Sequence, residues 1–522
     1  MGFRRLAPTL VAGVLAAVYV IVSPPSFDLA AHLLRAKLFD AEGFGIWSNW
    51  WYGGHNLPGY SVLFPAVSAA LSPQLAAGIA ATLTATVFEA FAHRHFGSRA
   101  WLGALWFGAA TATDLFTGRL AFAFGLLPAL ASALALQRSR PRLACALALL
   151  SALCSPVAAL FAALAGVASA IGAYAGTRRV RGLWPGIAVA SAALAPVGLL
   201  AIAFPEGGSE PFTFSTLWPV PVIAVVALLA LGRREWTLKA GIALYTLGCI
   251  ASFEIATPVG SNAARLGPLL AGPLAALLWW RRHTVLLLAA TAPLLYIQWQ
   301  PPFRDVTRSA GDPSASRGYY QPLLSFLARQ PGPPFRVEIP FTGFHWEAYE
   351  VAPRFPLARG WERQLDIEDN PLFYGSALTP ATYQAWLREL AVRFVAVSND
   401  VDLDYSAHKE TGLIDAGLPY LRLAFESRHW RVYAVHDATP IVSGAAILTT
   451  LGPDSLTLRA TRAGPAFVRV RFSPYWKLSE AGAGCVAPAG GFTRLRLARA
   501  GPVRLVIGFS LRRIGARSPR CS

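Results

Sequence analysis

The sequence is poor in charged residues and rich in apolar ones. Of its 522 residues, 14% are charged and 54% are hydrophobic, and the mean hydropathy is +0.44. Soluble globular domains contain about 25% charged residues. The composition therefore argues against an ordinary soluble protein and calls for a search for membrane-spanning segments.

Motifs of soluble enzymes are missing as well. The sequence has no ligand pattern of a zinc site, no Walker phosphate loop, no dinucleotide fingerprint and no serine nucleophile elbow. The formal net charge of +18 could indicate binding to nucleic acid, but the positions of the basic residues decide its meaning. In the first half the basic residues flank apolar segments, so we expect no nucleic-acid partner.

Acidic residues are scarce in the first part of the chain. Residues 1–299 contain 19 Lys or Arg and 9 Asp or Glu, whereas residues 300–522 contain 27 and 19. Apolar stretches fill the first part and predict eleven membrane crossings, several shorter than the ~20 residues of a perpendicular span. The predicted crossings are 6–23, 73–92, 101–116, 120–136, 142–154, 157–176, 183–204, 218–232, 238–254, 266–280 and 284–299.

Basic residues provide an independent check on these crossings. Most of those in the first part fall at alternate loops, which the positive-inside rule assigns to the cytoplasm together with the N-terminus. The opposite loops contain only Arg35, Lys37, Arg119 and Arg265. The first apolar segment begins like a secretory signal, but its length and the lack of a small-residue cleavage site favour a retained span.

The same rule predicts a turn at Ser155–Pro156. The basic clusters at 138–142 and 177–181 both belong to predicted cytoplasmic loops. An even number of crossings must lie between them, so the proline marks a turn and not a kink in one long helix.

The second part has the pattern of folded extracytoplasmic domains. Residues 300–437 predict an α/β domain, with short strands and a helix that begins after Thr379, a natural N-cap followed by Pro380. Residues 438–522 contain only strand patterns, separated by Gly, Pro and Asp turns at hairpin spacing. They predict a β-sandwich. Residues 1–299 form the predicted transmembrane domain.

The chain has five cysteines, and their predicted environments differ. Cys145, Cys154 and Cys249 lie in apolar spans, where cysteine packs as a small residue. Cys485 and Cys521 lie in the predicted outer part, where an oxidising compartment permits a disulfide that ties down the tail. Two free thiols are the alternative.

The stretch FDLAAHLLRAKLFD at 27–40 contains the first candidate site. Asp28, His32 and Arg35 fall on one stripe of a helix. Asp28 could act as a general base, or orient an acceptor hydroxyl or a metal. It could instead be a first-turn acid beside a Ser26 cap. His32 could hydrogen-bond Asp28 or a substrate phosphate, or it could be an interfacial histidine. Arg35 continues the stripe as a substrate-binding candidate, and its alternative is to snorkel with Lys37 at the membrane surface.

A Trp- and Gly-rich segment follows, GFGIWSNWWYGGHNLPGYS at 43–61. Trp47, Trp50, Trp51 and His55 stand among glycines that allow close backbone approach. Such a mixture can form an aromatic platform for a sugar or an isoprenoid. The alternative is the aromatic belt of a bilayer interface.

The remaining candidates lie at other predicted outer loops. Arg265 is the only cation in EIATPVGSNAARLGPLL, where a guanidinium would suit a lipid phosphate, with Glu254 and Asn262 nearby in sequence. Its alternative is a structural pair with Glu254 or Asp114. Asp114 and Arg119 could contribute to the same cavity or form a local ion pair.

These residues carry a resemblance to known proteins. An acid and a histidine after the first span, then LPGYSVLFP, resemble the start of GT-C superfamily glycosyltransferases. The chain is similar to the bacterial membrane family labelled "6-pyruvoyl-tetrahydropterin synthase-related", a label that does not imply pterin chemistry. FPLARGWERQLDIEDNPLFYGSALTPATYQAWLRELAVRFVAVSND and SPYWKLSEAG resemble that family's extracytoplasmic region.

The resemblance implies a GT-C-like fold of about eleven spans in a bacterial plasma membrane, with a polyprenyl-phosphate sugar as donor and an envelope glycan or lipid as acceptor. It assigns Asp28 as the acid of the first outer loop and Arg265 as a donor-phosphate ligand. Many GT-C enzymes have two adjacent acids in that loop, whereas Asp28 stands between Phe27 and Leu29. Binding of a divalent metal and catalysis itself are therefore open, and a lipid or glycan flippase or a non-catalytic envelope assembly protein are the alternatives.

Overall fold

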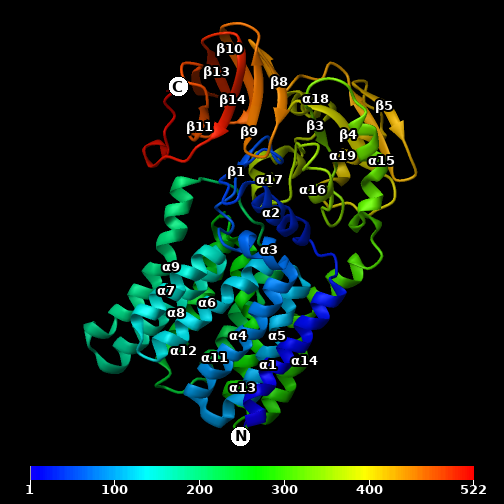
Figure 1. Cartoon of the computed structure of the whole chain (residues 1–522). Helices are drawn as coiled ribbons and strands as arrows, with labels where there is room; N and C mark the ends of the chain where they lie inside the picture. The colour runs from blue at the N-terminus through cyan, green and yellow to red at the C-terminus, as the bar shows by residue number, and fades with distance from the viewer. Residues whose placement is uncertain (1, 522) are drawn as a thin grey trace. The chain divides into compact units, whose positions relative to one another are not determined.

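The computed structural model describes residues 2–521, which form two compact units. The first unit comprises Met1–Ala36, Gly59–Ala201 and Gly207–Ala310, and the second comprises Lys37–Pro58, Ile202–Glu206 and Gly311–Ser522. Figure 1 shows helices from blue to green, followed by the strands of the last part in orange to red. A helical N-terminal region is thus followed by a sheet-rich C-terminal region. The predicted division at 299 and 437 stays a prediction.

Each of the eleven predicted apolar ranges falls on a helix of the first unit. Within residues 2–521, six stretches are long and apolar enough to cross a membrane: Phe3–Val22, Pro73–Phe116, Leu120–Gln137, Pro156–Thr177, Val180–Ala203 and Trp236–Glu254. The region is therefore membrane-embedded and multi-pass, and the count of eleven stays a prediction. The helices are α1 (Gly2–Val22), α4 (Pro73–Phe96), α5 (Trp101–Phe116), α6 (Leu120–Gln137), α7 (Pro141–Cys154), α8 (Pro156–Thr177), α9 (Trp184–Ala203), α11 (Pro219–Ala230), α12 (Trp236–Glu254), α13 (Leu266–Trp279) and α14 (Thr284–Ser309).

The predicted turn between 154 and 156 is confirmed. Ser155 has extended backbone angles between α7 and α8, and its hydroxyl accepts a hydrogen bond from the backbone N–H of Ala158. The serine therefore caps a new helix, and Pro156 occupies the first turn, where its missing N–H costs nothing.

Small residues let the helices of this unit approach closely. A Cβ at Gly108 would lie 2.4 Å from the carbonyl oxygen of Pro8, and one at Gly125 would lie 2.7 Å from the Cβ of Ser155. Buried alanines fill the contacts among α6, α7 and α8. This is the packing expected where van der Waals contact holds helices together in lipid. Short elements then join the long helices: α2 (Leu29–Glu42), α3 (Phe64–Leu71), α10 (Phe214–Leu217) and η3 (Gly260–Arg265).

The second unit contains a four-stranded mixed sheet with helices. Its strand order is β3 (Arg336–Glu338), β4 (Val392–Ser398), β6 (Trp430–Val435) and β5 (Leu421–Glu426), with β3 and β4 parallel. The helix predicted after Thr379 is α18 (Pro380–Glu389), and Thr379 and Thr382 form its capping box. The other helices are α15 (Arg317–Ala328), α16 (Glu347–Glu350), α17 (Arg363–Asp369) and α19 (His408–Asp415).

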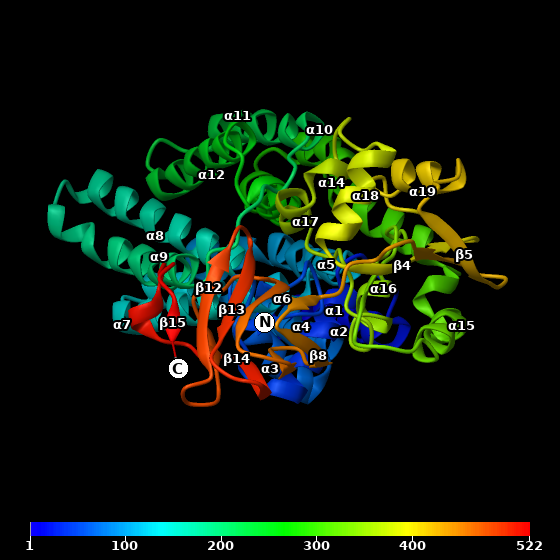
Figure 2. The same ribbon diagram turned by 90° about the horizontal axis from the view of Figure 1, so that it is seen from above.

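Two antiparallel sheets at the end of the chain share one core. Their strand orders are β15-β12-β13-β10-β7 and β11-β14-β9-β8, and Figure 2 shows β12 beside β13. Val468 and Leu495 from one sheet pack with Leu458 and Leu505 from the other, which makes a sandwich. A disulfide joins Cys485 to Cys521. The strands are β7 (Val442–Gly444), β8 (Ala446–Leu451), β9 (Ser455–Ala460), β10 (Gly464–Arg471), β11 (Trp476–Leu478), β12 (Gly484–Ala489), β13 (Phe492–Leu497), β14 (Gly501–Ile507) and β15 (Arg520–Cys521).

Candidate functional site

The first turn of α2 is fixed against the loop between α5 and α6. Gly118 has φ +77°, and a Cβ there would lie 2.3 Å from the hydroxyl oxygen of Ser26 and 3.5 Å from the backbone nitrogen of Asp28. The backbone carbonyl of Asp28 accepts from the N–H of His32, so Asp28 stands at the start of the helix. Glycine at 118 is therefore needed twice, for its left-handed backbone and for this close approach.

His32 is held in one orientation and is electrically neutral. Its side chain is buried, and its Nε2 lies 3.1 Å from the carbonyl oxygen of Gly118, which can only accept a hydrogen bond. The proton must therefore be on Nε2, which leaves a lone pair on Nδ1. Within residues 2–521 that Nδ1 has no hydrogen-bond partner. Burial, with the positive charge of Arg35 nearby, lowers the pKa of His32 to about 3.

Arg119 interacts electrostatically with charged side chains from distant parts of the first unit. Its charge interacts with Asp28 at the start of α2, with Asp114 on α5, with Asp305 on α14 and with Arg265. The guanidinium nitrogen Nη1 of Arg119 lies 3.8 Å from a carboxylate oxygen of Asp114, so the local ion pair considered from the sequence is present. The same side chain nevertheless joins the wider group.

Arg35 and Arg265 add two positive charges to this group. Arg35 is buried, with its guanidinium 4.7 Å from the centre of the Tyr60 ring. Arg265 ends η3 and lies 5.5 Å from the centre of the Phe122 ring. The positive charge of Arg265 interacts electrostatically with His32, Asp114 and Arg119. Among the described residues, the Arg265 guanidinium makes no hydrogen bond or salt bridge, so its donors are available to an anion.

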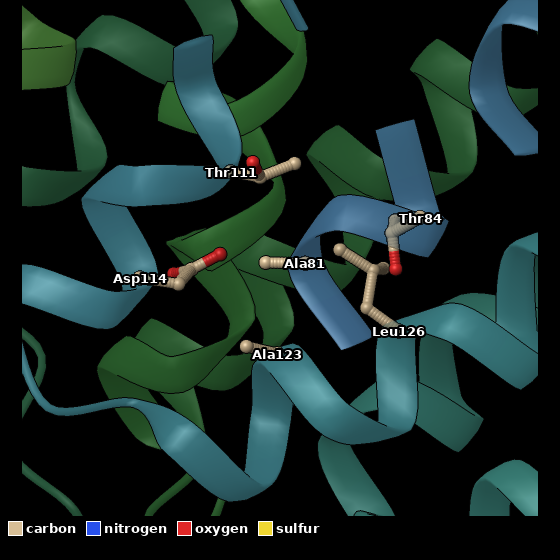
Figure 3. Close-up of a pocket in the computed structure, with 6 residues that line it drawn as sticks. All are labelled: Ala81, Thr84, Thr111, Asp114, Ala123 and Leu126. Atoms are coloured by element: carbon tan, nitrogen blue, oxygen red, sulfur yellow. The ribbon is translucent and has the colours of Figure 1, made fainter. Parts of the chain in front are cut away.

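Asp114 also borders a narrow gap between α4, α5 and α6. The gap is lined by Thr84, Thr111, Asp114 and the apolar side chains of Ala81, Ala123 and Leu126. Figure 3 shows the carboxylate of Asp114 directed toward it. The hydroxyls of Thr84 and Thr111 donate to carbonyls of their own helices, at Ala80 and Gly108. Asp114 is thus the one lining group whose charge is shared with the arginines.

The acids of this site do not form a metal-binding arrangement. In the described part of the chain, no group of three or more His, Cys, Asp or Glu side chains is placed to hold a metal ion. A metal-binding role for Asp28 stays a prediction, and the chemistry proposed below is assigned to the side chains of the chain itself.

The tryptophans of the Gly-rich segment belong to the second unit and are buried there. Trp47 is 3% exposed and packs edge-on against Trp476 in the core of the sandwich. Trp51 is 1% exposed, stacks on His55 and donates to the carbonyl of Ala348. Trp50 is buried as well. This packing favours a structural role, and substrate binding by these residues stays a prediction.

The last two candidates lie apart from the charged group or at its edge. Glu254 is exposed at the C-terminal end of α12, and no salt bridge joins it to Arg265 within residues 2–521. Asn262 is half-buried on η3, three residues before Arg265. Asp305 was missed, because sequence reasoning assigned residues after 299 to the outer domain. The structure continues α14 beyond this boundary to Ser309, which places Asp305 on the same helix as the last predicted crossing.

A second group of charged residues is buried in the α/β part of the second unit. Arg359 is 1% exposed, and its guanidinium donates to Asp366, Glu410 and Ser406. The rings of Phe341 and Phe373 each lie 4.0 Å from the guanidinium carbon. Every part of this arginine is engaged, which identifies a structural network.

Comparison with known proteins gives a limited result. No family model matches the chain, and no curated protein matches it. Among solved structures, it is similar to the archaeal oligosaccharyltransferase AglB from Archaeoglobus fulgidus, described in complex with an inhibitory peptide and a dolichol-phosphate. The TM-score is 0.48 at 11% identity, over 76% of this chain and 69% of the other.

Proposed function

We propose that the chain is a GT-C-type membrane glycosyltransferase, which moves a sugar from a polyprenyl-phosphate donor to an envelope glycan or lipid acceptor on the outer face. The observation that carries the proposal is the gathering of Asp28, Arg119 and Arg265 from separate loops of the helical unit. Ionised side chains are costly at the edge of a bilayer, so a group in which the Arg265 guanidinium makes no hydrogen bond or salt bridge within residues 2–521 fits a site for an anionic ligand.

Arg265 binds the phosphate of the donor in this proposal. Its guanidinium offers planar, bidentate donors that match a phosphate. Arg119 adds positive charge beside it but is already balanced by Asp114 at 3.8 Å. The leaving lipid phosphate is therefore stabilised chiefly by Arg265, whose guanidinium makes no hydrogen bond or salt bridge within residues 2–521.

Asp28 acts as the general base. The acceptor O–H bond breaks, its proton passes to the Asp28 carboxylate, and the oxygen forms a bond to the anomeric carbon. The bond from that carbon to the phosphate oxygen breaks, and the lipid phosphate leaves with the electron pair. A single displacement of this kind inverts the anomeric configuration, and a positioned base contributes about 10²–10⁴-fold to the rate.

His32 takes a narrower role than the sequence left open. A neutral imidazole with a lone pair on Nδ1 repels a phosphate oxygen and attracts a hydroxyl hydrogen. We therefore assign Nδ1 as an acceptor for a hydroxyl of the sugar or of the acceptor. Its low pKa makes it too weak a base to compete with Asp28.

The test is sugar transfer by the purified full-length chain from a panel of radiolabelled polyprenyl-phosphate sugars to envelope-glycan acceptors. The proposal expects transfer from at least one donor, with inversion, and its loss in Asp28→Asn at unchanged folding. No transfer from any donor of a broad panel would contradict it, as would transfer with retained configuration.

A further inference from the structure

The point where the chain leaves α9 is fastened to the β-sandwich. α9 lies in one of the six stretches able to cross a membrane, and the residues Ile202–Glu206 at its end belong to the second unit. The hydroxyl of Tyr475 donates to the carbonyl of Ala203 at 2.5 Å. The ring of Phe204 lies 5.5 Å from the ring of Tyr475 and 5.5 Å from that of Phe509. Phe509 therefore packs against Phe204, the residue that follows α9 in the chain.

Phe509 belongs to a short segment after β14, residues 508–517, which is held in place at several points. Arg513 donates through Nε to the carbonyl of Pro474 and through Nη2 to the carbonyl of Ser518. Arg520 donates to the carbonyls of Gly508 and Tyr475. The disulfide between Cys485 and Cys521 fixes the end of the chain that follows. The segment thus has a defined conformation and presents a defined face.

That face combines exposed apolar side chains with cations. Leu511 is 75% exposed and Phe509 is 49% exposed. Arg512 and Arg517 are exposed, and neither makes a hydrogen bond or salt bridge within the described part of the chain. A large apolar side chain left in water beside unpaired arginines is unusual for a water-facing surface, whereas both kinds of side chain are favoured at a membrane interface.

The charge of the sandwich favours an anionic partner. Residues 440–522 contain 13 Lys or Arg and 2 Asp or Glu. Lys477 on β11 also lies over the segment, since a Cβ at Gly508 would be 2.8 Å from its Cε. Anionic headgroups attract such a surface over roughly a Debye length. A soluble anionic glycan would satisfy the arginines but would leave Leu511 and Phe509 in water.

We propose that residues 508–517 form an interfacial anchor that binds anionic phospholipid headgroups of the membrane in which the helical unit resides. Leu511 and Phe509 enter the boundary between headgroups and acyl chains, and Arg512 and Arg517 bind lipid phosphates. The anchor goes beyond the proposed sugar transfer and does not depend on it.

The experiment uses the full chain in nanodiscs, with the three free cysteines replaced and an environment-sensitive fluorophore on Leu511→Cys. Lipids with a shallow nitroxide should quench the label at 511 by about twofold or more if it lies in the interface. A label on Ile447→Cys, a 42% exposed apolar position on β8, is the matched control and should not be quenched. Equal quenching at both positions, or none at 511, would overturn the proposal.

The headgroup requirement is tested by lipid composition. Quenching at 511 should increase when anionic phospholipid replaces zwitterionic lipid, and Arg512→Gln with Arg517→Gln should remove that increase. Arg459→Gln, an exposed arginine on β9, should leave it intact. A response to soluble anionic polysaccharide in zwitterionic discs, without a response to anionic lipid, would assign the surface to a glycan and contradict the anchor. Neither readout uses sugar transfer, so failure of the proposed enzyme activity leaves this test unaffected.

Discussion

Arg359 in the second unit is fully buried, whereas Arg265 in the helical unit is half-buried, and the surroundings of the two arginines differ. Arg359 donates to Asp366, Glu410 and Ser406 and lies between two aromatic rings. Arg265 contacts one ring face and makes no hydrogen bond or salt bridge within residues 2–521. A cation whose donors are all used stabilises a fold, whereas a cation whose donors are left open is placed for a ligand.

We predict that substitution of the two arginines differs most in its effect on the stability of the protein. Arg359→Gln leaves Asp366 and Glu410 buried without their cation, so the free energy of unfolding of the second unit should fall by about 3–5 kcal/mol. Thermal unfolding of the full chain, followed by tryptophan fluorescence, measures this loss. Arg422→Gln, at an exposed position on β5, is the control and should change little. An Arg359→Gln chain with unchanged stability would contradict the structural assignment.

Arg265→Gln should show the reverse pattern. Loss of a charged hydrogen bond to the donor phosphate is worth about 2–3 kcal/mol, which corresponds to a drop of roughly 30- to 150-fold in kcat/KM. Stability should stay near that of the wild type, because no protein partner loses a bond. Kinetics at varied donor concentration measure the effect, with Arg282→Gln, exposed at the other end of α13, as the control. If the Arg265→Gln chain were unfolded, Arg265 would have a structural role like that of Arg359.

A third prediction concerns Glu338, a buried acidic residue of the second unit. It is fully buried on β3, and neither carboxylate oxygen has a hydrogen-bond partner in the described residues. Burial, with the negative charge of Glu410 nearby, raises its pKa well above the usual value, against the opposing charge of Arg359. Burial therefore favours the protonated form of this carboxyl group in the folded unit.

The sign of the resulting pH dependence follows from linkage. A folded-state pKa above the unfolded value means that the contribution of Glu338 is complete below about pH 4.3 and is lost as pH rises above it, by up to about 1.4 kcal/mol per unit. Glu338→Gln cannot ionise, so its thermal stability should fall less steeply between pH 5 and 8 than that of the wild type. Identical slopes in the two proteins would show that Glu338 is paired and ionised.

The smallest predicted effect is at His32. His32→Phe keeps the ring but removes both nitrogens, so one hydrogen bond to a substrate hydroxyl, worth about 1 kcal/mol, should be lost. The KM of the hydroxyl-bearing substrate should rise about fivefold, and the affinity for lipid phosphate should be unchanged. Because the pKa of His32 is about 3, the wild-type rate should show no transition from this residue between pH 5 and 8. A histidine-like transition near pH 6.5 that disappears in the variant would contradict the neutral assignment.

Local features were predictable from the sequence, and long-range packing was not. The apolar ranges lie on helices, the turn at Ser155 is present, and Thr379 caps α18, because each depends on neighbours within a few residues. Asp305 and Gly118 join the site through contacts between elements far apart in sequence, which no local pattern encodes. Trp47 fills the sandwich core beside Trp476 for the same reason.

The central claim is that Asp28 is the base of a sugar-transfer site. The most direct measurement compares transfer rate and donor binding in Asp28→Asn with Asp40→Asn, an exposed acid on the same helix. We predict that Asp28→Asn binds the donor within a few-fold of the wild type and loses about 10²–10⁴-fold in the rate of transfer. Asp40→Asn should keep both. Transfer that survives Asp28→Asn, or that falls equally in both variants, would contradict the assignment.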